Sequence, residues 1–126
     1  MREIKQLTKA EFQVMQILWN LPGQGGFTGD ILAEYDDPKP AYTTLATFLK
    51  ILTGKGFIRC RKKGNKLYYT PTVSQKDYAE VYFAPVKSTF FHDSFQEMIR
   101  FLFNREHLSE GEVRDIIDII QESQKR

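Results

Sequence analysis

The chain has 126 residues, of which 41% are hydrophobic and 27% charged, and its formal net charge is +2. These values are ordinary for a folded, soluble protein of one compact domain or two small ones. No apolar run approaches the ~20 residues of a membrane-spanning helix, and the N-terminus lacks a signal-peptide core. A lone cysteine, Cys60, cannot form an intrachain disulfide. We therefore expect a cytoplasmic protein with no membrane partner.

The charge is unevenly distributed along the chain. Residues 1–73 contain 11 Lys and Arg against 6 Asp and Glu, a balance of +5, whereas residues 74–126 contain 7 against 10, a balance of −3. A basic half joined to an acidic half is typical of a protein in which one part meets a polyanion. The alternative is a chance asymmetry between two solvated surfaces, and charge alone leaves both open.

The first 40 residues predict two helices. Thr8 and Glu11 form a capping-box pattern at the start of the first helix, and the Gly- and Pro-rich segment 21–26 ends it. Thr28 is a candidate N-cap for a short second helix, and residues 36–40 form the turn that follows. The inward apolar positions of the two helices are Phe12, Val14, Met15, Leu18, Trp19, Ile31, Leu32 and Tyr35.

Residues 41–56 predict a third helix with two unlike faces. Four apolar residues recur at i, i+3, i+4 and i+7, whereas the opposite face is small, hydroxylated or cationic. Glycine near positions 54 to 56 supplies a left-handed exit from the helix. The apolar set is Leu45, Phe48, Leu49 and Leu52, and the polar set is Thr43, Thr44, Ala46, Thr47 and Lys50.

Two short strands joined by a basic turn follow the third helix. Alternation places Ile58 and Cys60 on one side of the first strand and Arg59 and Arg61 on the other. The turn spans residues 62–66 and contains three lysines. A helix with a narrow polar face, followed by a basic hairpin, indicates a winged helix-turn-helix with a two-stranded wing, in a mainly α (α+β) fold. Such a module places one helix in the major groove of double-stranded DNA.

The candidate DNA-binding residues lie on the third helix and the wing. Threonine can bond base edges or phosphates and can pack its methyl group on thymine, while lysine and arginine neutralise phosphates. Two alternatives stay open: the first two threonines cap the helix, and the lysines are a solvated hairpin tip. The candidates are Thr43, Thr44, Ala46, Thr47, Lys50, Arg61, Lys62, Lys63, Asn65 and Lys66.

Residues 74–126 predict further helices. Ser74 and Ser109 are candidate N-caps, Pro85 is expected to interrupt or kink a helix, and residues 88–103 fit one helical stripe. A segment of about 50 residues is too small to bury this apolar surface alone. We therefore predict a DNA-binding domain over 1–73 and a homodimerisation domain over 74–126. The alternative is that these helices fold back on the N-terminal module. The predicted dimer interface is Phe91, Phe95, Met98, Ile99, Leu102, Phe103, Ile116 and Ile120.

Residues in the first helix, the third helix and the wing carry a family pattern. They are Leu7, Thr8, Ala10, Glu11, Val14, Met15, Leu18 and Trp19; then Ala41, Tyr42, Thr43, Thr44, Leu45, Leu49, Leu52, Lys55 and Gly56; then Gly64, Tyr69 and Pro71. With them the chain resembles the penicillinase-repressor family, which includes the bacterial β-lactamase and methicillin-resistance repressors and related copper-transport repressors. The resemblance covers residues 7–71 closely and residues 76–122 by helix length and apolar stripe.

The resemblance implies a dimeric repressor that binds a palindromic operator, with the threonine face reading bases and the wing contacting phosphates. Asn65 stands where the family often has arginine, and Lys66 can supply that charge. Some members are inactivated by cleavage of an Asn-Phe bond, but the aligned pair here is Phe101-Leu102, so this induction is not predicted. Copper-responsive members carry C-terminal Cys-x-Cys ligands, which this chain lacks.

Catalytic and metal motifs are weak. His92 and Asp93 are merely adjacent, and neither histidine forms a recognised metal spacing with Cys60. We therefore predict a bacterial, homodimeric, sequence-specific repressor that is not an enzyme and needs no cofactor or metal. Two alternatives are a winged-helix module for protein contacts and a repressor gated by a small molecule. The aromatic residues considered for such an effector are Phe83, Phe90, Phe91 and Phe95. The operator, the regulated genes and the inducing signal are not encoded in recognisable motifs.

Overall fold

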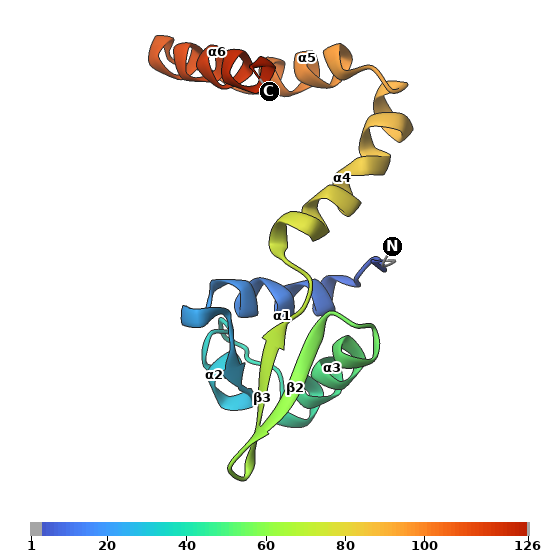
Figure 1. Cartoon of the computed structure of the whole chain (residues 1–126), viewed down its shortest axis with the longest axis vertical. Coiled ribbons are helices and arrows are strands. Elements are labelled where there is room, and N and C mark those ends of the chain that lie inside the picture. Colours follow the sequence, from blue (N-terminus) through green and yellow to red (C-terminus); the bar gives the residue numbers. More distant parts are fainter. Residues whose placement is uncertain (1–3, 126) are drawn as a thin grey trace. The chain divides into compact units, whose positions relative to one another are not determined.

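The structure is a computed structural model that describes residues 4–125 (Figure 1). It is mainly helical with one small antiparallel sheet, as predicted. Its elements, in chain order, are α1 (Lys9–Asn20), the short 3-10 helix η1 (Pro22–Gln24), β1 (Gly26–Phe27), α2 (Thr28–Ala33), α3 (Tyr42–Gly54), β2 (Ile58–Lys63), β3 (Lys66–Pro71), α4 (Gln75–Phe91), α5 (Phe95–Arg105) and α6 (Glu110–Gln124).

The sheet has one strand more than the sequence predicted. Within residues 4–125 it is three-stranded, in the order β1-β3-β2, and both pairings are antiparallel. The predicted wing is confirmed as the β2–β3 hairpin, which turns at Gly64 and Asn65, with Lys63 opposite Lys66. Gly64 has a φ of 64°, which glycine adopts without a Cβ clash. The added strand, β1, has only two residues, and its pairing with β3 depends on tertiary contact rather than local sequence.

The start of α2 differs by one residue from the prediction. Thr28 is the first helical residue and is buried, whereas Phe27 occupies the N-cap position. The Phe27 backbone N–H donates to the Asp30 carboxylate at 2.9 Å. The acceptor therefore comes from within the first turn and not from a threonine hydroxyl.

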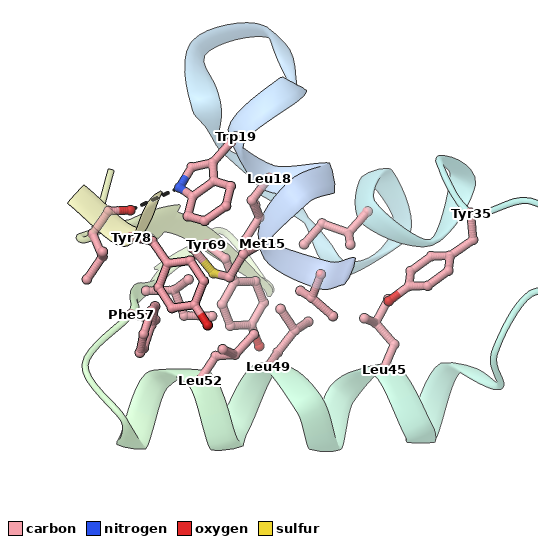
Figure 2. Close-up of a cluster of buried hydrophobic side chains, with 14 residues drawn as sticks. Met15, Leu18, Trp19, Tyr35, Leu45, Leu49, Leu52, Phe57, Tyr69 and Tyr78 are labelled. Carbon is pink, nitrogen blue, oxygen red and sulfur yellow. Dashed lines mark hydrogen bonds between the residues drawn. The ribbon is translucent and has the colours of Figure 1, made fainter. Parts of the chain in front are cut away.

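The core of the N-terminal part lies between α1, α2, α3 and the sheet (Figure 2). Val14, Met15 and Leu18 of α1 have no exposed surface, nor do Leu45 and Leu49 of α3. The helical periodicity that predicted these inward faces is confirmed. Burial of such side chains contributes about 1.5–3 kcal/mol each relative to an exposed position.

Aromatic side chains join the start of α4 to this core. The ring of Tyr78, on α4, lies 5.6 Å from Phe12, 6.2 Å from Trp19 and 5.7 Å from Phe57 between ring centroids. Its hydroxyl accepts a hydrogen bond from the Leu7 backbone N–H at 2.9 Å. The first turns of α4 are therefore part of the same folded body as α1.

The described chain forms two compact units that divide between Phe83 and Ala84, inside α4. The sequence placed its functional division at 73/74, ten residues earlier. Tyr78 explains the difference, because it is only 4% exposed and packs in the core of the N-terminal unit. The assignment of DNA binding and dimerisation to separate parts of the chain stays a prediction.

Two local predictions for the C-terminal unit, residues 84–125, differ from the structure. Pro85 lies inside α4, which continues to Phe91, so the predicted interruption is wrong, and the alternative, a kink at Pro85, stays a prediction. The stripe over residues 88–103 is not one helix, because His92 and Asp93 have φ values of 52° and 60° and separate α4 from α5. The Ser109 prediction is confirmed, since its hydroxyl accepts from the Glu112 backbone N–H and begins α6.

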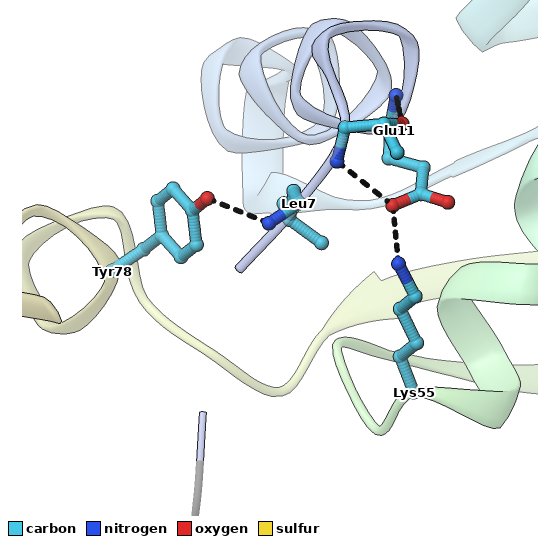
Figure 3. A network of polar contacts seen from close by, with 5 residues as sticks. Leu7, Glu11, Lys55 and Tyr78 are labelled. Atoms are coloured by element: carbon cyan, nitrogen blue, oxygen red, sulfur yellow. Dashed lines mark hydrogen bonds and ion pairs between the residues drawn. The ribbon is translucent and has the colours of Figure 1, made fainter. Parts of the chain in front are cut away.

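A partly buried ion pair connects the first turn of α1 to the end of α3 (Figure 3). The Glu11 carboxylate completes the predicted capping box by accepting from the Thr8 backbone N–H at 3.1 Å, and it accepts from Lys55 Nζ at 2.6 Å. Burial alone raises the pKa of Glu11. The hydrogen bonds from Lys55 and Thr8, together with the positive charge of Lys55, outweigh burial and lower the pKa below its usual value.

We expect Glu11→Gln to lower the free energy of unfolding by about 1–2 kcal/mol at neutral pH, because it leaves the Lys55 charge without its counter-ion. A lowered folded-state pKa gives stability that is complete above the unfolded pKa, about 4.3, and is lost as pH falls through the folded value. The difference between wild type and variant should therefore shrink below about pH 4. Urea unfolding across pH measures it, with the exposed Glu80→Gln as control. A pH-independent difference would contradict the role given to the charge.

Candidate nucleic-acid interface

The outer face of α3 carries the predicted reading residues. Thr43, Thr44, Thr47 and Lys50 are exposed, and Ala46 is half-buried. The inner face holds the helix in place through Leu45, Leu49 and Leu52, which have no exposed surface. The structure therefore brings the five predicted positions of this helix together on one accessible side, although contact with DNA stays a prediction.

The capping alternative for the threonines is wrong. Ala41 occupies the N-cap of α3, and this cap has no side-chain hydrogen bond in the described chain. Thr47 is different, because its hydroxyl donates to the Thr43 carbonyl oxygen at 3.0 Å. With its proton engaged, the hydroxyl presents lone pairs and a methyl group outward. It is suited to accept from an adenine or cytosine amino group or to pack on a thymine methyl.

The strand register distributes the wing cations over two faces. Arg61 lies opposite Tyr68, and Lys63 opposite Lys66, so these side chains share one face of the hairpin. Lys62 lies opposite Leu67 on the other face, and both are exposed beyond the end of the core. The tip therefore offers positive charge on both sides.

Tyr68 shields the sheet. Its ring lies 5.0 Å from that of Phe27, and a Cβ added at Gly25 would lie 2.5 Å from its hydroxyl oxygen. Lys63 Nζ lies 3.8 Å from the centroid of the same ring, a cation–π distance. The contacts on this side hold one wing lysine in place while its charge stays exposed.

The sequence around this surface contains no acidic residue. Residues 38–73 have eight Lys and Arg and no Asp or Glu. Two of the eight donate hydrogen bonds to oxygen atoms within the protein: Lys55 to the Glu11 carboxylate, and Lys39 to backbone carbonyls. Six remain around the α3 face and the hairpin: Lys50, Arg59, Arg61, Lys62, Lys63 and Lys66.

Two exposed residues extend the predicted set. Tyr42, in the first turn of α3, is 59% exposed, and Arg59 is exposed on the same face of β2 as Arg61. Alternation along the strand already placed Arg59 on the same face as Arg61, but the predicted set did not include it. Tyr42 had no comparable signal, because an aromatic residue at a helix start is just as often buried.

Lys39 fixes the turn between α2 and α3. Its Nζ donates to the carbonyl oxygens of Leu32, Ala33 and Tyr35 at 3.3, 3.1 and 2.5 Å. Leu32 and Ala33 are the last residues of α2 and Tyr35 lies two positions beyond it, where helix carbonyls run out of backbone donors. The lysine thereby holds the end of one helix against the segment that begins the next.

We expect Lys39→Met to lower the free energy of unfolding by roughly 1 kcal/mol, because these carbonyls lose a charged donor. Lys39→Arg should retain most of that stability. Chemical denaturation measures both, with Lys76→Met at an exposed position of α4 as the matched control. Equal midpoints for the Lys39→Met and Lys76→Met variants would show that the contacts contribute nothing.

The predicted dimer residues all lie in the C-terminal unit, on the end of α4 and on α5 and α6. No residue from 84 to 125 is buried, although α5 and α6 carry apolar stripes. Phe95 is 58% exposed and Ile120 is 53% exposed. The other predicted residues are half-buried or exposed: Phe91, Met98, Ile99, Leu102, Phe103 and Ile116. Their role in self-association stays a prediction.

No group of three or more His, Cys, Asp or Glu among residues 4–125 is placed to hold a metal ion. Cys60 is half-buried and packs against the core. No helix in the described part of the chain is long and apolar enough to cross a membrane.

A family model described as penicillinase repressor matches residues 7–122. The penicillinase repressor of Bacillus licheniformis is 26% identical over 127 aligned positions, which cover 100% of this chain and 98% of that protein. An uncharacterised 16.5 kDa protein of Latilactobacillus sakei is 32% identical over 72 positions, 56% of this chain and 47% of that protein. These matches confirm the resemblance inferred from the helix and wing residues.

Solved structures agree with the winged-helix fold. The DNA-binding domain of the repressor BlaI matches with a TM-score of 0.52 and 29% identity, over 62% of this chain and 94% of that one. Monomeric Bacillus licheniformis BlaI in complex with the blaP half-operator matches over the same shares, with a TM-score of 0.50 and 29% identity. Bordetella bronchiseptica BpsR has a TM-score of 0.50 at 18% identity over 90% of this chain and 76% of that one, which supports the fold alone.

Proposed function

This chain belongs to the penicillinase repressor family of DNA-binding transcriptional repressors, and from that premise we propose that it acts in the cytoplasm as a homodimer on an inverted-repeat operator. The observation that carries this proposal is the exposed threonine face of α3 beside an acid-free, cationic hairpin. Within the proposal α3 enters the major groove and the wing contacts the phosphate backbone. No step requires catalysis or a cofactor.

Base recognition is assigned to the threonines. Thr43, Thr44 and Thr47 offer hydroxyl oxygens and methyl groups but no bidentate fork, so each contact discriminates less than an arginine–guanine pair. Ala46 leaves room for the helix to approach the bases closely. Specificity then depends also on the spacing between two half-sites and on DNA shape.

The BlaI complex supports the half-site part of the proposal. Its monomeric form was solved with a half-operator, and 94% of that chain matches 62% of this one. We therefore assign one half-site to each copy of this chain. The exposed apolar stripes of α5 and α6 support pairing of two copies, because a second copy would remove them from water.

The experiment that tests this function is an in vitro selection of genomic fragments with the purified full chain near physiological salt. A short inverted repeat among the enriched fragments is the expected result. Salt-sensitive binding without a shared motif would contradict sequence-specific repression. The absence of any DNA binding would contradict the proposal altogether and favour a winged-helix module that binds proteins.

We expect the double substitution Thr44→Ala, Thr47→Ala to weaken binding to the selected operator by about 10- to 100-fold, roughly 1–3 kcal/mol, because base contacts on α3 are lost. Binding to unrelated DNA should change little, since the cations remain. Fluorescence anisotropy with both DNAs measures the ratio. The matched control is Thr53→Ala. Thr53 lies at the end of α3 and is not among the predicted reading residues, and its hydroxyl donates to the Leu49 carbonyl oxygen. An equal loss for both DNAs would contradict base reading by these threonines.

A further inference from the structure

A groove opens between α1 and the first half of α4, within the N-terminal unit. Its volume is about 510 Å³, which lies in the ordinary range for small-molecule sites. The groove lies outside the α3 face and the hairpin assigned to DNA. The fold and the proposed repressor function do not account for it.

Aromatic side chains form most of the groove. Trp19 and Tyr78 are 5% and 4% exposed, whereas Tyr82 and Phe83 are 51% and 62% exposed. The rings of Tyr82 and Phe83 meet edge to face at 5.6 Å, and Phe12 completes the apolar lining. These rings suit a flat apolar body, because offset and edge-to-face ring contacts are favourable.

The polar end of the groove is positive. Among the described residues that line it, Lys9 is the only charged one, and Thr8 and Gln75 add neutral polar groups. Lys9 is also the first residue of α1, where the helix dipole favours negative charge. The Glu11 carboxylate already caps this helix start, so the attraction for a bound carboxylate comes from the Lys9 ammonium group.

We propose that this groove binds a small organic acid with an aromatic body, and that the bound acid is an effector of DNA binding. The rings hold the body, and Lys9 attracts the carboxylate. Tyr78, Ala79, Tyr82 and Phe83 all lie on α4, which leads into the C-terminal unit. A ligand therefore contacts the helix that joins the proposed reading and pairing parts, and this regulatory role rests on the proposed function. Phe83 was grouped with Phe90, Phe91 and Phe95 by sequence, but those three do not line this groove.

Trp19 is the only tryptophan in the chain and lines the groove, so its fluorescence reports on occupancy without any DNA. The probe is 3-phenylpropanoate, and its neutral counterpart is 3-phenylpropanamide. We expect a saturable fluorescence change with both, and about two- to five-fold tighter binding of the acid, the size of an exposed charge pair. The absence of a saturable change with either probe would overturn the site.

Two variants locate the binding. Lys9→Gln should remove the preference for the acid, whereas Lys76→Gln, also exposed but outside the groove, should retain it. Ala79→Leu should fill the groove and abolish binding of both probes, whereas Ala84→Leu on the same helix should not. Unchanged binding by the Ala79→Leu variant would place the ligand elsewhere and overturn the site.

Further measurements separate the other outcomes. A fluorescence change with protein concentration alone, absent in the Ala79→Leu variant, would mean that a second copy covers the groove, and would overturn the ligand site. Operator affinity is then measured with and without saturating 3-phenylpropanoate, and a change that is lost in the Ala79→Leu variant is expected. Binding of the probe with unaltered operator affinity would overturn the effector role. If the protein bound no DNA even without the probe, the proposed function would be contradicted instead.

Discussion

Operator affinity is expected to fall about 10³- to 10⁵-fold when the salt concentration rises from 50 to 200 mM. Each copy of the chain offers five predicted cations, which makes ten in a dimer: Lys50, Arg61, Lys62, Lys63 and Lys66. Cations that bind phosphates release condensed counterions, so the logarithm of the affinity falls linearly with the logarithm of salt, by about 0.9 for each phosphate contact. Six to ten contacts give the range stated.

A titration by fluorescence anisotropy at several salt concentrations measures this slope. Lys66→Gln should reduce its magnitude by about 1.8 in a dimer, because one phosphate contact is lost in each copy. Lys76→Gln removes the same charge from an exposed position on α4 and should leave the slope unchanged. A flat salt profile for the wild-type protein would contradict the whole predicted surface, whereas an unchanged slope for the Lys66→Gln variant would remove only that residue from it.

Helices with strong local signals were predictable from sequence. Thr8 with Glu11, and Ser109 with Glu112, satisfy backbone N–H groups at helix starts, and both capping boxes are present in the structure. The inward positions of α3 followed from a 3.6-residue period, because burial of one face leaves a periodic pattern. These features depend on residues a few positions apart, which is why they can be read along the chain.

Features that depend on distant residues were missed. The pairing of β1 with β3 joins segments more than 40 residues apart, and Lys55 reaches Glu11 across 44 positions. The break at His92 and Asp93 was missed for another reason. The apolar spacing continues across these residues, whereas the helical backbone conformation does not. A periodic pattern fixes which residues share an apolar face more reliably than it fixes whether one helix carries them.

The candidate interface was predictable in its composition but not in its geometry. A polar face on α3 and lysines in the wing follow from residue types. The division of Lys62 from Lys63 over the two hairpin faces required the strand register, and the removal of Lys39 and Lys55 from the free cations required their contacts. Charge counts along a sequence cannot distinguish a lysine that meets DNA from one that supports the fold.

Leu102→Asp is expected to convert the predicted dimer to monomers and to weaken binding to a full operator about 10²- to 10⁴-fold. Leu102 is 46% exposed and lies in the α5 stripe with Phe95, Met98 and Ile99. In a two-fold dimer each substitution occurs twice at the same interface, so two carboxylates are placed in an apolar contact without partners. Two linked half-site contacts then become two separate ones, and the gain from high effective concentration is lost.

Sedimentation equilibrium measures the association state, and anisotropy with full and half operators measures the consequence. The Leu102→Asp variant should bind a half operator as the wild type does, because α3 and the wing lie in the N-terminal unit. Ile119→Asp is the matched control: Ile119 is 61% exposed on α6 but outside the predicted interface. If the Leu102→Asp variant stayed dimeric and retained full-operator affinity, the α5 stripe would not be the pairing surface. Loss of half-operator binding as well would mean that the two units do not act separately.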